Sequence, residues 1–302
     1  MRHVSGVMDL EYIDPRKIRL EGFKVAVDAT NGAASAVAPE LLRALGCEVV
    51  EIDCQLTGLF TRDPEPRREN IGQLCATVRD TGADVGFALD PDGDRLALVD
   101  ERGEPLGEDY TLVICADVVL GKSKGAVVTN LSTSKAVEDV ALRHGVEFLR
   151  APIGEINVVQ KMKAVDSTIG GEGNGGVILP ALHYGRDALV GMALVLEAMV
   201  EAGASVSEMM KKFPKYDIVK QKVRLAGKVD FESLRDLLEQ EFAGARFNFE
   251  DGIRMELDQG WLHLRRSGTE PVLRLITEAG DPESSRHLLS KALHVLRKRG
   301  GL

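Results

Sequence analysis

The chain has 302 residues, a length that predicts about two domains or three small ones. It carries 38 Lys and Arg against 47 Asp and Glu, and its net charge of −9 argues against nucleic acid or an anionic membrane as the main partner. With 44% hydrophobic and 28% charged residues, the composition is that of a globular protein and excludes a disordered one. The sequence has no run of 18 apolar residues and no apolar stretch of a signal peptide at its start, so we expect a soluble cytoplasmic protein.

The four cysteines form no C-x-x-C pair: Cys47, Cys54, Cys75 and Cys115. Metal-binding and redox cysteines usually show such close spacing. We therefore interpret these four as reduced thiols of an intracellular protein.

The first hundred residues are predicted to form one α/β unit. Apolar runs and turn signals indicate, in order, a strand at 23–28, a helix at 33–45, a strand at 47–52, a helix at 70–81 and strands at 83–88 and 96–99. The first three elements favour a parallel pair of strands, because parallel strands need a crossover between them.

A second α/β unit is predicted from about Glu108. Its expected elements are a helix at 110–120, a strand at 125–129, a helix at 133–144, a strand at 146–149 and a helix at 189–202. The succession of two such units predicts two similar domains with mixed sheets, at 1–104 and 105–215.

From about Tyr216 the pattern changes to short strands with two helices. Strands are expected at 218–223, 252–257, 261–265 and 272–277, and helices at 231–242 and 282–299. Asp281 and Pro282 suit the cap and the first position of the last helix. The predicted fold class is therefore α/β, with a smaller α+β domain at 216–302 after the two α/β domains.

An acidic loop lies between the last two predicted strands of the first unit. Asp90, Asp92 and Asp94 alternate along it, and Arg95 follows. Carboxylates at alternate positions of an extended loop can converge on one hard cation, and Mg²⁺ prefers such oxygen ligands. A calcium EF-hand is not favoured, because Arg95 takes the sixth position, where that loop needs glycine. An acidic turn with solvated carboxylates remains the alternative.

The second loop is rich in glycine and covers residues 170–176, Gly-Gly-Glu-Gly-Asn-Gly-Gly. It satisfies the dinucleotide pattern G-x-G-x-x-G, but a strand-like run follows at 177–180, where a dinucleotide site needs a helix. Glu172 and Asn174 suit paired hydrogen bonds to adjacent hydroxyls, as on a sugar ring. A tight turn with both side chains on the surface is the alternative.

The third loop combines hydroxyl groups, a glycine and a guanidinium: Arg265, Ser267, Gly268 and Thr269. Backbone N–H groups of a glycine-containing turn can point at phosphate oxygens, and arginine can add a bidentate pair. The sequence therefore predicts an anion site here. The alternative is a polar hairpin with Arg265 in a surface ion pair.

Taken together and in this order, the three loops resemble those of the α-D-phosphohexomutase family, which includes phosphoglucomutase, phosphomannomutase and phosphoglucosamine mutase. Residues 90–95 match the family's metal loop Asp-x-Asp-x-Asp-Arg, 171–175 its sugar loop Gly-Glu-x-Ser/Asn-Gly, and 265–269 its phosphate loop Arg-x-Ser-Gly/Asn-Thr. Weaker matches lie at 31–33, 63–70 and 185–187. The resemblance runs from about Glu11 to the end of the sequence.

The resemblance implies a mutase that interconverts hexose or hexosamine 1-phosphate and 6-phosphate through a bisphosphate, with a phosphoserine as phosphoryl donor. It implies Mg²⁺ held by Asp90, Asp92 and Asp94, with Arg95 as the catalytic residue beside the transferring phosphoryl group. It also implies six substrate-binding residues: Glu172 and Asn174 for the sugar hydroxyls and Arg265, Ser267, Gly268 and Thr269 for the other phosphate, with Arg274 as a further candidate.

Two features depart from the family pattern. Family members have four domains, and the serine lies in the first, in a motif like Thr-Ala-Ser-His-Asn-Pro that this sequence lacks. Ser132 and Ser134 suit helix capping or a substrate loop rather than that role. Gly176 closes the sugar loop where many members have histidine, and His183 could serve instead. We therefore expect domains two to four, inactive alone, as a fragment, a split protein or a non-catalytic relative.

Two other functions remain open at this stage. A sugar-phosphate-binding protein would keep the ligand loops and lack the chemistry. A magnesium-dependent phosphatase would need a nucleophilic aspartate at a strand end, where Asp28 and Asp90 stand. The expected partners are a hexose or hexosamine phosphate and either a separate catalytic domain or a second copy of the chain. The sequence leaves the preferred sugar open.

Overall fold

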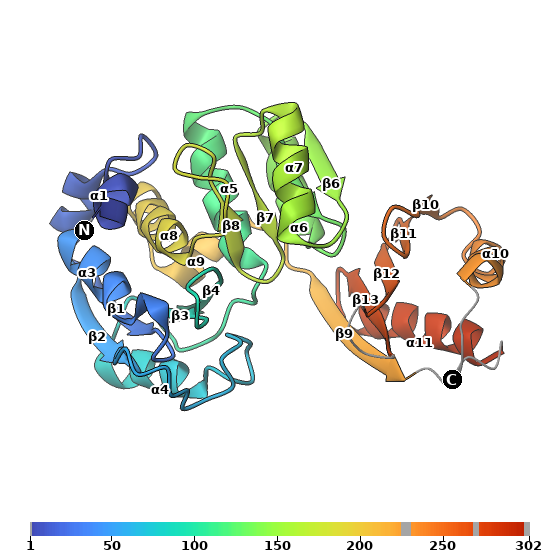
Figure 1. The fold of residues 1–302 in the computed structure, drawn as a ribbon, viewed down its shortest axis with the longest axis horizontal. Coiled ribbons are helices and arrows are strands. Elements are labelled where there is room, and N and C mark those ends of the chain that lie inside the picture. The colour runs from blue at the N-terminus through green and yellow to red at the C-terminus, as the bar shows by residue number, and fades with distance from the viewer. Residues whose placement is uncertain (1, 225–230, 268–271, 299–302) are drawn as a thin grey trace. The chain divides into compact units, whose positions relative to one another are not determined.

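The computed structural model describes residues 2–224, 231–267 and 272–298 (Figure 1). Its contacts group the chain into two compact units. The first contains the residues up to Arg150 together with Gly154–Pro214, and the second contains Ala151–Ile153 and the chain from Lys215 onward. Two mixed sheets and one antiparallel sheet confirm the predicted fold class. The three predicted domain ranges stay predictions.

The first sheet has the strand order β2-β1-β3-β4. β1 pairs parallel with β2 and β3, and β4 pairs antiparallel with β3. β3 and β4 are buried along their whole length, so the acidic loop between them is held firmly at both ends. The strands are β1 (Lys24–Asp28), β2 (Glu48–Ile52), β3 (Val85–Leu89) and β4 (Leu96–Asp100).

The predicted helix at 33–45 is wrong in one respect, because it is split into a short 3₁₀ turn (Ala33–Ser35) and α3 (Val37–Ala44). The Ala33 amide donates to the Pro91 carbonyl at 2.7 Å, and the Ser35 hydroxyl donates to the Gly32 carbonyl at 2.8 Å. These bonds fix the turn after β1 against the acidic loop, and the regular helix starts only after it. The next helix, α4 (Gly72–Thr81), lies within its predicted range.

The second sheet repeats the first with the strand order β6-β5-β7-β8. β5 pairs parallel with β7, and β7 pairs antiparallel with β8, so the Gly-rich loop connects two strands as the acidic loop does. α5 (Tyr110–Lys122) and α8 (Ala188–Ala202) pack on each other and contact both β4 and β8, which joins the two sheets. The strands are β5 (Val127–Asn130), β6 (Phe148–Ala151), β7 (Ile169–Glu172) and β8 (Gly176–Ile178).

Several short elements are present that the sequence analysis did not predict: α1 (Arg2–Met8), α2 (Pro15–Glu21), α7 (Glu155–Val165), α9 (Val206–Met209), β7 and β10 (Arg246–Asn248). α1 and α2 have seven residues each, too few for a clear apolar period. α7 could have been predicted from the sequence, because its buried side chains, Val158, Val159 and Met162, follow helical spacing.

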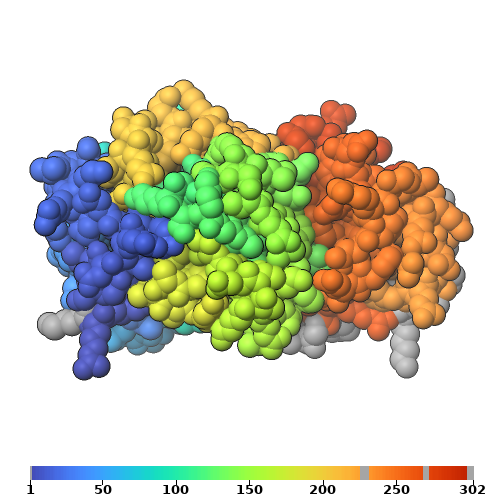
Figure 2. Space-filling view, turned by 90° about the horizontal axis from the view of Figure 1, so that it is seen from above, coloured from blue at the N-terminus to red at the C-terminus, as the bar shows by residue number. Residues whose placement is uncertain are grey.

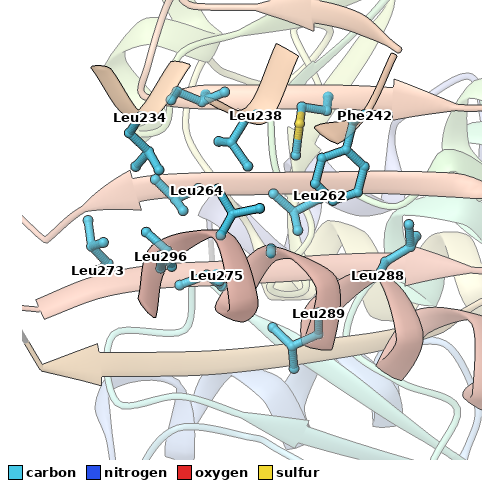
Figure 3. Packing of buried hydrophobic residues seen from close by; sticks show 14 of the residues in the cluster. Leu234, Leu238, Phe242, Leu262, Leu264, Leu273, Leu275, Leu288, Leu289 and Leu296 are labelled. Atoms are coloured by element: carbon cyan, nitrogen blue, oxygen red, sulfur yellow. The ribbon is translucent and has the colours of Figure 1, made fainter. Parts of the chain in front are cut away.

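The second unit has a fully antiparallel sheet in the order β10-β11-β12-β13-β9. Leucines from two helices and two central strands meet in its core (Figure 3). The Asp281 carboxylate accepts from the amides of Glu283 and Ser284, both at 2.9 Å, which confirms the predicted helix cap. The elements are β9 (Asp217–Arg224), α10 (Phe231–Glu241), β10, β11 (Ile253–Leu257), β12 (Gly260–Arg266), β13 (Val272–Ala279) and α11 (Pro282–Lys298).

Within the described residues, no single helix combines the length and apolar character needed to cross a membrane. One pair of helices bent by 80°, Ala188–Ala202 and Val206–Lys212, meets the criterion on length and composition. All four cysteines are free thiols.

Candidate functional site

The acidic loop brings its three carboxylates together as predicted. One ligand oxygen from each of Asp90, Asp92 and Asp94 lies within 4.8 Å of the others. Asp90 is buried, Asp94 is partly buried and Asp92 is exposed, so the cluster opens to solvent on the Asp92 side. The Asp90 Oδ1 accepts from the amides of Asp94 and Arg95 at 3.0 Å, which curls the loop around that carboxylate.

The chemistry of the cluster suits a divalent cation. Burial and the neighbouring Asp94 raise the pKa of Asp90 well above its usual range, because the charged form is desolvated and lies close to other carboxylates. Within the described residues, the buried Asp94 Oδ1 has no hydrogen-bond partner. A cation would satisfy that oxygen and offset the crowded negative charge. Oxygen donors of this kind fit Mg²⁺.

Arg95 is held at the edge of the carboxylate cluster. Its Nη1 donates to the Glu65 Oε1 at 2.8 Å, and its Nε lies 3.4 Å from the Asp90 Oδ2 and 3.7 Å from the Asp94 Oδ1. Glu65 comes from the segment 63–70 and was not assigned a role from the sequence. It keeps the guanidinium beside the aspartates.

The Gly-rich loop buries Glu172 and leaves Asn174 half-buried. The Glu172 Oε1 accepts from the Asn130 Nδ2 at 2.8 Å and from the Gly154 amide at 3.3 Å. The Asn174 Oδ1 accepts from the Gly176 amide at 3.2 Å. The alternative interpretation, a turn with both side chains on the surface, is therefore wrong for Glu172, which is buried.

Arg186 connects the two loops, and the sequence analysis gave it no role. One Nη of its guanidinium donates to the Asp94 Oδ2, and the other donates to the Glu172 Oε2 at 2.7 Å. Its backbone amide donates to the Glu155 Oε1 at 2.8 Å. A single cation thus pairs the acidic loop with the Gly-rich loop.

The glycines of the loop make this close approach possible. Gly175 has φ +88°, and a Cβ there would lie 2.4 Å from the Leu96 carbonyl oxygen, while its own carbonyl accepts from the Leu96 amide at 3.0 Å. A Cβ on Gly176 would lie 2.3 Å from the Arg186 Cδ. The stem of Arg186 therefore occupies the space that a side chain at position 176 would need. The Nε2 of His183, which the sequence offered as one possible substitute, lies 2.9 Å from the Asp187 Oδ2.

The segment after β5 supports the Gly-rich loop. The Thr133 hydroxyl accepts from the Gly173 amide at 3.0 Å and donates to the Asn130 Oδ1 at 3.0 Å. The Ser134 hydroxyl accepts from the Ala136 amide at 3.1 Å and caps α6 (Lys135–Arg143), as predicted. Ser132 is half-buried in the same turn.

The third loop lies in the second unit, between β12 and β13. The Ser267 amide donates to the Val272 carbonyl at 2.9 Å, which closes the hairpin on either side of residues 268–271. Gly268 and Thr269 lie outside the described residues. Arg265 is partly buried, with its Nε 3.4 Å from the Asp251 Oδ2. The ion pair of the alternative interpretation is therefore present.

A row of cations crosses the sheet beside this loop. Arg265 lies directly opposite Arg274 on β13, and Arg274 lies directly opposite Lys222 on β9. Directly opposite residues share one face of an antiparallel sheet, so the three positive side chains are lateral neighbours. Three cations in such positions concentrate positive charge on this face of the sheet. Lys222 was not predicted from the sequence.

Models of three domains of one family match nearly the whole chain. The alpha/beta/alpha domain II of phosphoglucomutase/phosphomannomutase matches residues 2–103, domain III matches 107–216, and the C-terminal domain matches 219–292. The chain belongs to the phosphoglucomutase/phosphomannomutase family. The recognition of this family from the three loops is confirmed, and no match to its domain I lies in the chain.

Curated family members are similar along almost all of the chain. A phosphoglucomutase/phosphomannomutase of Thermococcus kodakarensis is 36% identical over 290 residues, which are 95% of this chain and 63% of that protein. A probable phosphoglucosamine mutase of Methanopyrus kandleri is 33% identical over 300 residues, 98% of this chain and 65% of that protein. The chain thus spans less than two thirds of the length of these relatives.

Solved structures of the family share the fold. A family protein from Burkholderia thailandensis superimposes with a TM-score of 0.82 at 28% identity, covering 95% of this chain and 64% of that one. An N-acetylphosphoglucosamine mutase of Aspergillus fumigatus, solved with GlcNAc-6P and magnesium, has a TM-score of 0.64 at 14% identity, covering 98% of this chain and 64% of that one. At that identity the similarity shows the fold alone.

Proposed function

We propose that this chain provides the metal, sugar and phosphate sites of a phosphohexomutase, which interconverts the 1-phosphate and 6-phosphate of a hexose or hexosamine through a bisphosphate. The observation that carries the proposal is the junction of the acidic and Gly-rich loops within one unit. Arg186 pairs Asp94 with Glu172, and the Leu96 amide donates to Gly175. This junction supports the proposal, because a sugar-phosphate enzyme needs its cation site and its sugar site side by side.

Asp90, Asp92 and Asp94 would hold Mg²⁺. The bound ion supplies positive charge where a transferring phosphoryl group gathers negative charge. The closely spaced carboxylates and the Asp94 Oδ1, which has no hydrogen-bond partner among the described residues, support this assignment, because a cation would offset the gathered negative charge and satisfy that oxygen.

The remaining residues bind and orient the substrate. Arg95, fixed by Glu65, would stabilise the charge of the transferring group. Glu172 and Asn174 would bind sugar hydroxyls, with Glu172 exchanging one of its present partners for the substrate. In the second unit, Arg265, Ser267 and Arg274 would bind the other phosphate. Gly268 and Thr269, outside the described residues, keep the same proposed role.

Lys222 extends the proposed phosphate site. It shares a face of the sheet with Arg274 and Arg265, so a phosphate beside this row would meet three cations. The concentration of positive charge in this row supports an anion as the natural ligand of the third loop, and the Arg265 Nε also lies 3.4 Å from the Asp251 Oδ2.

The reaction also needs a phosphoryl donor, and we propose a serine of the family's domain I in that role. The chain alone, given Mg²⁺, a hexose 1-phosphate and catalytic hexose bisphosphate, is expected to form no hexose 6-phosphate. Preceded by domain I of the Thermococcus kodakarensis relative, it is expected to form that product. A fusion that binds the bisphosphate but makes no product would favour a non-catalytic sugar-phosphate-binding protein. Turnover by the chain alone would refute the need for the serine.

We also propose that the enzyme works in the cytoplasm. The four free cysteines support this, because reduced thiols persist in a reducing compartment.

A further inference from the structure

A second cluster of metal-ligating side chains lies away from the acidic loop. It contains His3 on α1, His183 in the segment after β8, and Asp187 at the start of α8. The His3 Nε2 lies 2.8 Å from the Asp187 Oδ2, and the His183 Nε2 lies 2.9 Å from the same oxygen. One ligand atom from each residue lies within 4.8 Å of the others.

The carboxylate at the centre of this cluster is held in place. Asp187 is 5% exposed, and its Oδ1 accepts from the amides of Leu189 at 2.8 Å and Val190 at 3.2 Å, which caps α8. Its other oxygen, Oδ2, faces the two imidazoles. A carboxylate that is fixed through one oxygen by backbone donors is oriented to bind an ion through the other.

The two imidazoles converge on that oxygen from segments that are distant in sequence. α1 contacts α8 (Figure 1), and in Figure 2 the blue surface of the N-terminal segment borders the yellow surface of the segment near residues 180–200. The side chains of His3 and His183 are 42% and 41% exposed, so an ion can reach them from solvent.

The charge and the donor set both favour a cation. With neutral imidazoles the cluster has the negative charge of Asp187, and the Glu155 carboxylate lies close to His183, since a Cβ on Gly185 would lie 3.1 Å from the His183 Nδ1 and 3.7 Å from the Glu155 Oε1. The Arg186 guanidinium pairs with Asp94 and Glu172, and its Nε lies 3.5 Å from the Glu155 Oε2, so Arg186 offsets the charge of Glu155 and leaves that of Asp187. A neutral imidazole can carry its proton on Nδ1 and offer Nε2 as a ligand. Two imidazoles and one carboxylate suit Zn²⁺ or Co²⁺ rather than Mg²⁺.

We propose that His3, His183 and Asp187 form a binding site for a divalent transition-metal ion such as Zn²⁺, separate from the acidic loop. Three protein ligands leave a fourth position for water on the exposed side. The ion would tie α1 to the segment that carries Arg186, and so would stabilise that part of the first unit. The proposal rests on this geometry alone and does not depend on the proposed mutase function.

The test is equilibrium dialysis of the untagged chain against Zn²⁺ in excess Mg²⁺, which competes with Zn²⁺ for sites made of oxygen ligands alone, such as the acidic loop. We expect one Zn²⁺ per chain. The substitutions His3→Gln and His183→Gln are each expected to weaken binding roughly tenfold or more, because even the loss of a residue that only supports a ligand costs 10–100-fold. The side chains of His3 and His183 are well exposed, so both variants are expected to fold. Thermal unfolding in the absence of metal checks this.

His287→Gln is the matched control, because His287 is an exposed histidine on α11 in the other unit. Its Zn²⁺ affinity is expected to equal that of the unmodified chain. Co²⁺ provides a second measurement, since its visible absorption reports nitrogen ligands and should disappear in both variants. The proposal is wrong if the unmodified chain binds no Zn²⁺ in excess Mg²⁺, or if either variant binds it as tightly as the unmodified chain.

Discussion

Replacing Asp92 with asparagine is expected to weaken Mg²⁺ binding about 100-fold and to leave the fold intact. Asp92 is the exposed member of the three clustered carboxylates, so its substitution removes a ligand without opening a cavity. Asparagine keeps the size of the side chain but removes the charge that attracts the ion. The affinity is measured by calorimetric titration of the metal-free chain with Mg²⁺.

Thermal unfolding gives an independent test of the predicted loss of Mg²⁺ binding in the Asp92→Asn variant. A cation that binds the folded chain stabilises it, so we expect Mg²⁺ to raise the unfolding temperature of the original chain and a chelator to reverse the shift. The shift should vanish in the Asp92→Asn variant. Asp80→Asn is the matched control, because Asp80 is an exposed aspartate on α4 of the same unit. An Asp92→Asn variant that binds Mg²⁺ as tightly as the Asp80→Asn variant would contradict the assignment of the acidic loop.

Replacing Arg186 with methionine is expected to destabilise the first unit by about 3 kcal/mol. The side chain of Arg186 is 13% exposed and pairs with Asp94 and Glu172, whose side chains are 17% and 6% exposed. Removing the cation leaves both carboxylates poorly solvated and without their main counter-charge. Methionine fills the space of the arginine stem against Gly176, so the loss arises mainly from charge.

A double-mutant cycle separates the pairing from other effects of the substitution. Because Glu172→Gln removes the charge that Arg186 neutralises, the double variant should be more stable than Arg186→Met alone. Urea unfolding measures the free energy of unfolding of the double variant and of the Arg186→Met variant. Arg246→Met serves as the control for loss of a guanidinium, since that side chain is 85% exposed. Equal stability of the Arg186→Met and Arg246→Met variants would mean that the junction between the two loops contributes nothing.

The regular strands and helices were predictable because their apolar patterns are local. β3 and β4 appear in the sequence as apolar runs around the acidic loop, and the structure buries both completely. The helix predicted at 33–45 failed at its start because a hydrogen bond to Pro91, almost sixty residues away, sets the turn there. No local pattern contains that contact.

The site was predictable as separate loops but not as an assembly. Alternating aspartates in one short loop must lie close together, so their clustering followed from the sequence. The pairing of Arg186 with Asp94 joins residues 92 positions apart and depends on the packing of α5 and α8 between the sheets. Lys222 became visible only through the register of β9 and β13.

The contact between Gly176 and Arg186 was also not predictable from the sequence. The sequence shows a glycine where many family members have histidine, and it offered His183 as a replacement. In the structure Arg186 occupies the space beside Gly176, and His183 pairs with Asp187. Gly176 and Arg186 are ten residues apart, and only the three-dimensional packing shows that they lie against each other.

The most direct measurement of the central claim is calorimetric titration of the chain with a hexose 1,6-bisphosphate in the presence of Mg²⁺. We expect saturable binding that Arg265→Ala weakens about tenfold or more, because an arginine–phosphate pair contributes about 1.5–3 kcal/mol. The exposed Arg246, on another strand of the same unit, gives the control Arg246→Ala, whose affinity should not change. Absence of saturable binding, or equal affinity in the two variants, would contradict the assignment of this chain as the ligand-binding part of a phosphohexomutase.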